Sequence, residues 1–255
     1  MRRNMQMTVA ENAHCETAFP LGQRQLMHTS PLALTLDLDD TLWPIWPTID
    51  RAESVLHEWL LVHAPATAAR FDRQGLRILR DAVALENPHW LHDLAAIRGE
   101  SLRRALLLAG DDPAHADAAF AVFSEARQQV VLYDDALLSL QRLSQHFPVM
   151  GLTNGNADLD RIGLAPFFRG CVTSRSLGVA KPDSRIFHHA CQQLGCAPAQ
   201  VLHIGDDFEL DVKGAVRAGL QAVWLQRKPE HAEAGPGYRV FSDLTALTDA
   251  LLAQS

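Results

Sequence analysis

This sequence has few lysines, few cysteines and no long apolar segment. Only Lys181, Lys213 and Lys228 are lysines among the 23 basic residues, so each lysine merits inspection, although genome composition can explain the scarcity. The four cysteines (Cys15, Cys171, Cys191 and Cys196) form no CxxC pair and have no paired spacing with histidine. A zinc site and a disulfide framework are therefore not expected, and reduced thiols are typical of a cytoplasmic protein.

The missing apolar segment and the charge balance also exclude classes of partner. No apolar stretch reaches about 18 residues, the length typical of a membrane span, so we expect no membrane association. The first residues contain no continuous apolar core, so residues 1–30 are predicted to form a flexible N-terminal tail rather than a signal peptide. A net charge of −7 argues against nucleic-acid binding.

The pattern of apolar residues predicts an α/β fold with an inserted helical domain. Short apolar runs are expected as strands at about 32–37, 149–152, 171–173, 201–204, 222–225 and 238–241. Helical patterns lie between the later strands, near 135–145, 157–163, 184–194 and 211–218. This alternation predicts a Rossmann-like, doubly wound parallel sheet.

The helical domain is expected between the first and second strands. Four helices are predicted there: from a cap at Thr48 to His63, from about 66 to 85, from about 91 to 109, and from Asp112–Pro113 to about 130. We therefore expect residues 31–46 and 132–255 to form the α/β core and residues 47–131 to form a helical-bundle cap.

Polar residues follow the strands at the sheet edge where open α/β proteins bind ligands. The segment DLDDT brings Asp37, Asp39, Asp40 and Thr41, and LTN brings Thr153 and Asn154. KPD brings Lys181, and GDDFELD brings Asp206, Asp207 and Asp211.

This set of residues suits a phosphoryl group and a divalent metal. Clustered carboxylates need a cation or a proton, and oxygen ligands without histidine or cysteine favour Mg²⁺. A carboxylate can attack phosphorus, and a second carboxylate can protonate the leaving oxygen and later activate water. Each segment alone has a structural explanation, as a capping aspartate, a turn or a solvated lysine. The joint occurrence of four such segments at strand ends favours the chemical explanation.

The four segments resemble the motifs of the haloacid dehalogenase superfamily, in its phosphatase form. The resemblance covers about residues 32–226 and implies a nucleophile at Asp37 and a general acid/base at Asp39. By alternation along the strand end, Asp40 is expected to point elsewhere, to support the loop and to offer phosphate its backbone N–H at most. The resemblance implies phosphate contacts from Thr153, Asn154 and Lys181. It implies Mg²⁺ held by the Asp37 side chain, the Asp39 carbonyl and Asp206, with Asp211 as an outer acidic residue.

Asp39 also favours phosphate ester hydrolysis over dehalogenation, because the dehalogenase branch lacks an acidic residue at that position. The segments LTNGNADLDRIGL and LHIGDDFELDVKGAVRAGLQAVWL are similar to phosphatases acting on flavin mononucleotide or on 5-amino-6-(5-phosphoribitylamino)uracil. Within the helical domain and its hinge, the candidates for substrate recognition are Trp43, Trp46, Trp90 and Arg98, although packing in the core or hinge is the more common role for each tryptophan taken singly.

We therefore predict a Mg²⁺-dependent phosphomonoesterase that acts on a small phosphorylated metabolite through an aspartyl-phosphate. A phosphomutase on the same scaffold and a non-catalytic binding protein are the alternatives. The expected quaternary state is a monomer or a weak homodimer.

Overall fold

The computed structural model describes residues 30–227 and 234–253. Its strands form one sheet in the order β3-β2-β1-β4-β5-β6, and every neighbouring pair is parallel. Their bounds are β1 Ala33–Leu36, β2 Val149–Thr153, β3 Gly170–Thr173, β4 Val201–Gly205, β5 Gln221–Leu225 and β6 Tyr238–Phe241. The predicted doubly wound parallel sheet is confirmed, and each predicted strand is present.

Strand β1 lies in the middle of the sheet and is buried along its whole length. Leu36 is in register with Gly151 of β2 on one side and with Ile204 of β4 on the other. The carboxyl ends of these three strands therefore lie side by side, which brings the residues that follow each of them to one edge of the sheet.

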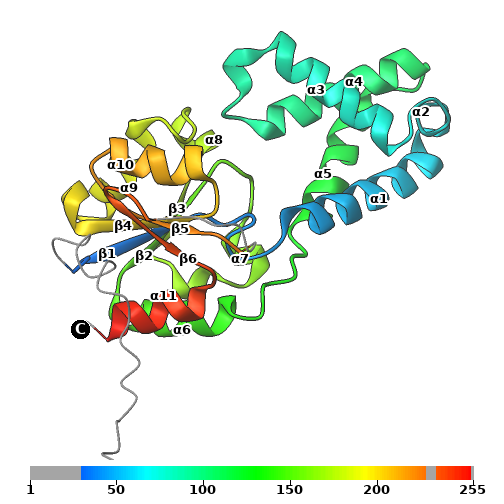
Figure 1. The fold of residues 1–255 in the computed structure, drawn as a ribbon. Coiled ribbons are helices and arrows are strands. Elements are labelled where there is room, and N and C mark those ends of the chain that lie inside the picture. Colours follow the sequence, from blue (N-terminus) through cyan, green and yellow to red (C-terminus); the bar gives the residue numbers. More distant parts are fainter. Residues whose placement is uncertain (1–29, 228–233, 254–255) are drawn as a thin grey trace, which may run out of the picture.

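Helices cover both faces of the sheet (Figure 1). Helices α6 and α11 pack on one face, where they bury leucines against β1, β4 and β5, and α9 and α10 pack on the other around Phe187. The helices of this domain are α6 Ala136–His146, α7 Leu159–Ile162, α8 Ser174–Leu177, α9 Ser184–Leu194, α10 Gly214–Arg217 and α11 Leu244–Leu252. Helix α9 has its predicted bounds, and its capping residue Asp183 accepts a hydrogen bond from the N–H of Arg185 over 2.9 Å.

The remaining helices lie together at one side of the sheet (Figure 1). They are α1 Ile45–His63, α2 Pro65–Arg70, α3 Arg73–Glu86, α4 Leu94–Ala109 and α5 Ala116–Arg127. Their buried side chains, among them Leu56, Leu106 and Phe123, form a cluster separate from those of the sheet. We propose on this ground that residues 47–131 fold as a unit of their own, which we call the cap.

Several predicted helix boundaries in the cap are wrong. Helix α1 begins at Ile45, and Thr48 lies buried inside it rather than capping it. The helix expected at 66–85 is two helices, because the side chain of Asp72 accepts from the N–H of Gly75 over 2.7 Å and starts α3 anew. The last helix begins with a 3₁₀ turn at Pro113 and ends at Arg127.

A boundary in the sheet domain is also different from the expected one. The helix expected at 211–218 is a π-helical turn over Phe208–Lys213 followed by α10. Asp207 caps this turn by accepting hydrogen bonds from the N–H groups of Glu209 and Leu210. The wider turn determines where Asp211 points.

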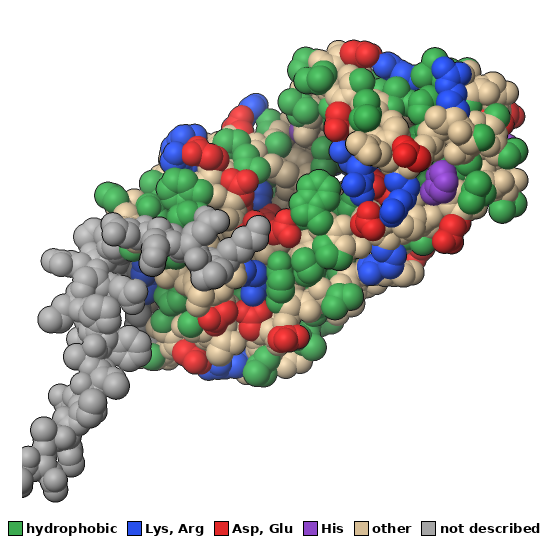
Figure 2. All heavy atoms as spheres, turned by 45° about the vertical axis from the view of Figure 1, so that its right-hand side comes forward, with side chains coloured by type: hydrophobic (Ala, Val, Ile, Leu, Met, Phe, Trp, Pro, Cys, Tyr) green, Lys and Arg blue, Asp and Glu red, His purple; other side chains and the backbone are tan. Residues whose placement is uncertain are grey.

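The surface and the start of the chain bear on the remaining expectations. Acidic and basic side chains are intermixed on the face that Figure 2 displays, with no continuous basic area in view. Within the described ranges, no helix has both the length and the apolar character that crossing a bilayer requires. The expected N-terminal tail, residues 1–30, falls outside the described residues apart from Ser30.

Candidate active site

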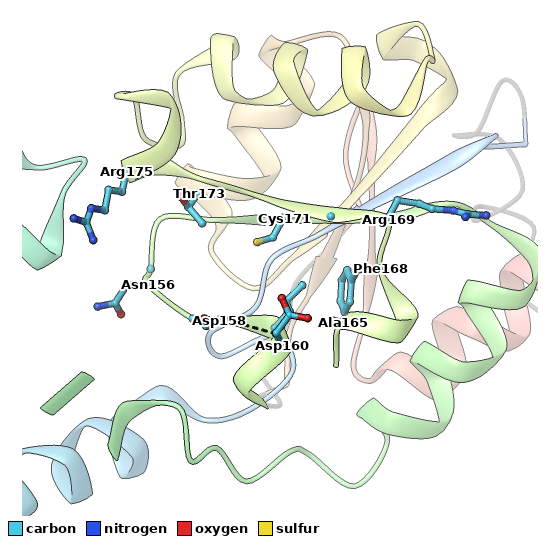
Figure 3. Close-up of a pocket in the computed structure, with 13 residues that line it drawn as sticks. Asn156, Asp158, Asp160, Ala165, Phe168, Arg169, Cys171, Thr173 and Arg175 are labelled. Atoms are coloured by element: carbon cyan, nitrogen blue, oxygen red, sulfur yellow. Dashed lines mark hydrogen bonds between the residues drawn. The ribbon is translucent and has the colours of Figure 1, made fainter. Parts of the chain in front are cut away.

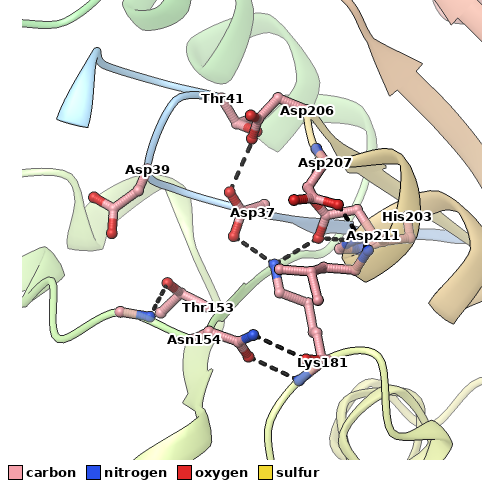
Figure 4. Close-up of polar contacts among 12 residues, drawn as sticks. Asp37, Asp39, Thr41, Thr153, Asn154, Lys181, His203, Asp206, Asp207 and Asp211 are labelled. Carbon is pink, nitrogen blue, oxygen red and sulfur yellow. Dashed lines mark hydrogen bonds and ion pairs between the residues drawn. The ribbon is translucent and has the colours of Figure 1, made fainter. Parts of the chain in front are cut away.

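Asp37 directly follows β1 and lies at the centre of a polar cluster (Figure 4). The Nζ of Lys181 lies 2.5 Å from Asp37 Oδ1, and the hydroxyl of Thr41 lies 3.4 Å from Oδ2. Burial raises the pKa of Asp37 well above its usual value, and the charges of Asp211 and Asp206 raise it further, while Lys181 opposes the shift. The Asp37 carboxylate therefore carries unrelieved repulsion that a further positive charge would remove.

Lys181 bridges two carboxylates and is held in place by Asn154. Its Nζ donates to Asp211 Oδ1 over 2.6 Å as well as to Asp37. Burial favours a lower pKa for Lys181, but the charges of Asp211 and Asp37 outweigh it and hold the pKa above the ordinary value. The amide of Asn154 accepts from the Lys181 N–H over 2.7 Å and donates to the Lys181 carbonyl over 3.0 Å. The side chain of Asn154 thus positions Lys181, and the predicted phosphate contact of Asn154 stays a prediction.

Asp211 is buried behind this pair and uses both of its oxygens. Oδ1 contacts Lys181 and, over 3.1 Å, the Nε2 of His203, and Oδ2 accepts from the N–H of Asp207. Although burial favours a raised pKa, Lys181 and His203 hold the pKa of Asp211 below its ordinary range. Burial in turn lowers the pKa of His203, whose Nδ1 lies 2.9 Å from the hydroxyl of Thr35.

A second aspartate, Asp206, completes a possible metal site with Asp37. Carboxylate oxygens of Asp37, Asp206 and Asp211 all lie within 4.8 Å of one another. Burial, together with the charges of Asp211 and Asp40, raises the pKa of Asp206 to about 7. Because the oxygens of Asp211 are already bound, Asp37 and Asp206 are the carboxylates best placed to hold a cation. This all-oxygen set fits a hard divalent ion.

Asp39 lies apart from these three carboxylates, and its side chain contacts the cap. Figure 4 shows the Asp39 carboxylate turned away from that of Asp37. Its Oδ1 and Oδ2 lie 2.6 and 2.8 Å from the Nη2 of Arg127, the last residue of α5. The indole N–H of Trp43 donates to Oδ1 over 2.8 Å. A metal contact of Asp39 would thus have to come from its main chain, as the sequence analysis expected.

The structure corrects the expected role of Trp43 and adds Arg127 to the site. Trp43 has no exposed surface and belongs to the core of the sheet domain, so its ring has no face free for a substrate. Arg127 is 1% exposed and was not predicted. It is separated from Asp39 by 88 positions and is one of several arginines on cap helices, so only the tertiary fold distinguishes it.

Asp40 supports the loop with its side chain, as expected. It has a positive φ of 57°, and its Oδ1 accepts from the N–H of Ile45, the first residue of α1. Its own N–H donates to the carbonyl of Trp43 over 2.8 Å and so is not available to phosphate in this arrangement. Thr153, in contrast, lies at the predicted position, where its hydroxyl accepts from the N–H of Gly155 over 2.9 Å.

A cavity of about 320 Å³ lies between the cap and Asp39. Its lining includes Trp46, just before the cap, and Leu94, Ile97 and Arg98 of the cap. Trp46 is 64% exposed, whereas Arg98 is mostly buried, stacks over Phe123 at 3.7 Å and lies 3.6 Å from Glu53. Burial lowers the pKa of Arg98 to about 10. Arg98 thus reaches the cavity as predicted, but it already has an acidic neighbour.

Another cavity, of about 530 Å³, lies beside β3 (Figure 3), and neither Asp37 nor Asp206 lines it. Gly155 and Asn156 line both cavities. Cys171 lines this second cavity, and burial raises the pKa of its thiol to about 12. The larger cavity therefore lacks the reactive groups gathered around Asp37.

Comparison with known proteins places these motifs in a family. Residues 32–219 match the model of the haloacid dehalogenase-like hydrolases. The chain is 34% identical over 205 residues to 5-amino-6-(5-phospho-D-ribitylamino)uracil phosphatase YigB of Escherichia coli, which covers 79% of this chain and 85% of that protein. It is 36% identical over 197 residues to the phosphoserine phosphatase of Thermus thermophilus, covering 74% and 73% of the two chains.

Solved structures agree with this assignment. A 2-haloacid dehalogenase from Pseudomonas syringae pv. Tomato DC3000 superposes with a TM-score of 0.80 at 33% identity, over 88% of this chain and 99% of that one. The HAD-hydrolase YfnB of Bacillus subtilis shares the fold with a TM-score of 0.64 at 20% identity, over 88% and 100% of the two chains. The fold, the four motifs and these matches together show that the chain belongs to the haloacid dehalogenase-like hydrolase family.

Proposed function

We propose that this hydrolase is a Mg²⁺-dependent phosphomonoesterase that forms an aspartyl-phosphate on Asp37. The observation that carries the proposal is the pairing of a buried, strand-end Asp37 with Lys181 at 2.5 Å, beside a second carboxylate whose pKa is raised to about 7. A bound cation and a phosphoryl group together would balance these charges. The named phosphatase relatives support the same reaction class.

The reaction divides into two displacements at phosphorus. In the first, an oxygen of Asp37 bonds to phosphorus while the ester P–O bond breaks, and the leaving alcohol takes a proton from Asp39. In the second, water attacks phosphorus and gives a proton to Asp39, which releases phosphate and restores the Asp37 carboxylate. Thr153 and Lys181 bind the phosphoryl oxygens. Mg²⁺ held by Asp37, the Asp39 carbonyl and Asp206 would neutralise the charge of the transferring group.

For the substrate we propose a small metabolite with a planar ring, either flavin mononucleotide or 5-amino-6-(5-phosphoribitylamino)uracil. The 34% identity to YigB supports this choice. The cavity next to Asp39 also supports it, because its lining is largely apolar and includes the exposed ring of Trp46 and the guanidinium of Arg98. A flat ring fits such a lining by stacking, with Arg98 facing its polar edge.

Dehalogenation is the competing activity, because the structural relative at 33% identity is named a 2-haloacid dehalogenase. Asp39 argues against it for this chain. Displacement of a halide needs no proton donor, whereas an alkoxide leaving group does.

A panel assay tests the proposal. Phosphate release from the two candidate substrates, phosphoserine and a sugar phosphate should be compared by kcat/KM, with halide release from 2-chloropropionate and sugar-phosphate isomerisation as the other readouts. We expect phosphate release that EDTA abolishes and Mg²⁺ restores, and no turnover by Asp37→Asn. Near-normal activity of Asp37→Asn would refute the assignment of Asp37 as the nucleophile. Halide release as the dominant reaction would show a dehalogenase, and isomer formation would show a phosphomutase, in place of the proposed phosphatase.

A further inference from the structure

Arg127 joins the cap to Asp39 at the point where the chain leaves the cap. It is the last residue of α5, and its Nη2 reaches both oxygens of Asp39 at 2.6 and 2.8 Å. Arg127 is almost fully buried, with 1% of its side chain exposed, whereas 21% of the Asp39 side chain is exposed. Among the described residues of the cap, Arg127 alone forms an ion pair with Asp39.

The surroundings of Arg127 are shaped to hold the guanidinium in this position. Its Nε donates to the Oδ1 of Asn156 over 2.9 Å. Gly155 leaves the necessary space, because a Cβ there would lie 2.4 Å from Asp39 Oδ2 and 3.4 Å from Arg127 Nη2. A side chain at position 155 would therefore push Asp39 out of its present orientation.

The third side-chain nitrogen of Arg127, Nη1, does not stabilise the fold through a hydrogen bond to the described residues. Nη1 is buried and has no hydrogen-bond partner among the described residues. A buried donor without a partner costs stability. Arg127 also lines the cavity next to Asp39.

Asp39 is thus held by one group from each domain. Trp43, in the core, donates to Oδ1 over 2.8 Å, and Arg127, in the cap, donates to both oxygens. Displacement of the cap would remove the second group and leave Asp39 held from one side only.

We propose that Arg127 is a positioning residue that orients Asp39 for proton transfer when the cap is seated on the core. This inference rests on the proposed phosphatase function, in which Asp39 gives a proton to the leaving oxygen and then takes one from water. Arg127 acts on the reaction only through Asp39. Acid/base catalysis by Asp39 therefore becomes available only when the cap is seated on the core.

Leaving-group dependence tests this role. An aryl phosphate such as 4-nitrophenyl phosphate loses a stable phenolate and needs little help from an acid, whereas an alkyl phosphate ester depends on it. Arg127→Gln should lower kcat/KM for the alkyl ester by about 10²-fold or more, the scale of general acid catalysis, and for the aryl ester much less. In an Asp39→Asn background, Arg127→Gln should not change the ratio of the two esters further.

Arg175→Gln is the matched control. Arg175 extends from the core toward the cap (Figure 3) and pairs with Asp93 of the cap at 3.4 Å without touching Asp39. Its loss removes a cap–core ion pair that is more exposed than the Arg127–Asp39 pair and does not involve Asp39, so it should leave the ratio between the two esters unchanged. Asn156→Ala is a milder variant that removes only the anchor of Arg127 Nε, and it should move the ratio in the same direction as Arg127→Gln by a smaller factor.

Several outcomes overturn the inference. Equal losses on both esters in Arg127→Gln, a ratio shift of the same size in Arg175→Gln, or an added ratio shift in the Asp39→Asn background would show that Arg127 only fastens the cap. If Arg127→Gln does not fold, an unchanged ratio in Asn156→Ala overturns it. A wild-type enzyme that cleaves neither ester would instead refute the proposed function itself.

Discussion

At the scale of single residues, we expect metal binding at Asp206 to depend on pH. Its pKa is raised to about 7 by burial and by the charges of Asp211 and Asp40. The folded protein therefore keeps a proton that the unfolded chain releases at its lower, ordinary carboxyl pKa. As pH rises from that value to about 7, the metal-free fold loses stability. A cation that binds only the ionised carboxylates should offset this loss most at higher pH.

The corresponding prediction concerns stabilisation by Mg²⁺. The gain in melting temperature between EDTA and excess Mg²⁺ should be larger at about pH 8 than at about pH 5, because protons compete with the ion below a pKa of about 7. Thermal unfolding in both buffers measures it. Asp206→Asn should lose most of the gain at both pH values, and a gain in the wild type that does not depend on pH would contradict the assignment.

Trp43 gives a second residue-scale prediction. Trp43→Phe keeps a large ring in the core but removes the N–H that donates to Asp39 over 2.8 Å. We expect a loss of about 1–3 kcal/mol in the free energy of unfolding, from the smaller ring and the lost hydrogen bond. Chemical denaturation measures it. A variant as stable as the wild type would show that neither the volume nor the hydrogen bond of Trp43 contributes to folding.

At the scale of elements, the end of β4 and the π-helical turn after it must approach closely. A Cβ on Gly205 would lie 2.3 Å from the Cγ of Asp211, so Gly205→Ala must displace that carboxylate and its contact with Lys181. We expect an activity loss on the order of 10–100-fold, as for other residues that orient a reactive group. Steady-state kinetics measures it.

Gly99→Ala is the control for the added methyl group. Gly99 lies within α4, and a Cβ there would meet nothing within 4 Å. Alanine should stabilise this helix by about 1 kcal/mol and leave kcat unchanged. If Gly205→Ala were as active as Gly99→Ala, Asp211 would not need its present position.

The elements that the sequence predicts correctly are those with a strong local signal. The strands are mostly apolar because both faces of the sheet are covered, and α9 has an aspartate cap followed by an amphipathic pattern. The break at Asp72 was missed because the helical period continues across it. The π-helical turn is not predicted because it runs directly into α10, so the apolar pattern indicates a single helix there.

The residues of the candidate site also divide into those with a local sequence signal and those without one. The side chains that directly follow strands, Asp37, Thr153 and Asp206, were predictable, because parallel strands bring their carboxyl ends together. The role of Asn154 was not, because it depends on how the Lys181 loop folds back onto β2. Arg127 required knowledge of how the cap packs on the core, for which local sequence contains no signal.

At the scale of the whole molecule, the cavity between the domains should discriminate among substrates by their leaving groups. Trp46→Ala removes an exposed ring from its lining. For ring-bearing esters such as flavin mononucleotide we expect KM to rise about 3–10-fold with little change in kcat, since a stacked aromatic pair contributes about 0.5–1.5 kcal/mol. Acetyl phosphate, which has no ring, should be unaffected.

Leu85→Ala is the matched control for this variant. Leu85 is an exposed apolar residue of the cap, 83% accessible, and it does not line the cavity. It should change KM for neither substrate. An equal effect of Trp46→Ala on acetyl phosphate and on flavin mononucleotide would show that Trp46 acts on the cap rather than on the ring of the substrate.

The two chain segments that connect the cap to the sheet domain are hydrogen-bonded to each other. The N–H of Tyr133 donates to the carbonyl of Leu42 over 3.0 Å, so the inserted domain leaves the core close to where it enters. The entropy of closing such a loop grows only slowly with its length. The insertion can therefore behave as a cassette: a cap of different length or sequence could be grafted between these two points while the register of β1 with β2 and β4 is kept, and new substrate ranges could arise without refolding the catalytic half.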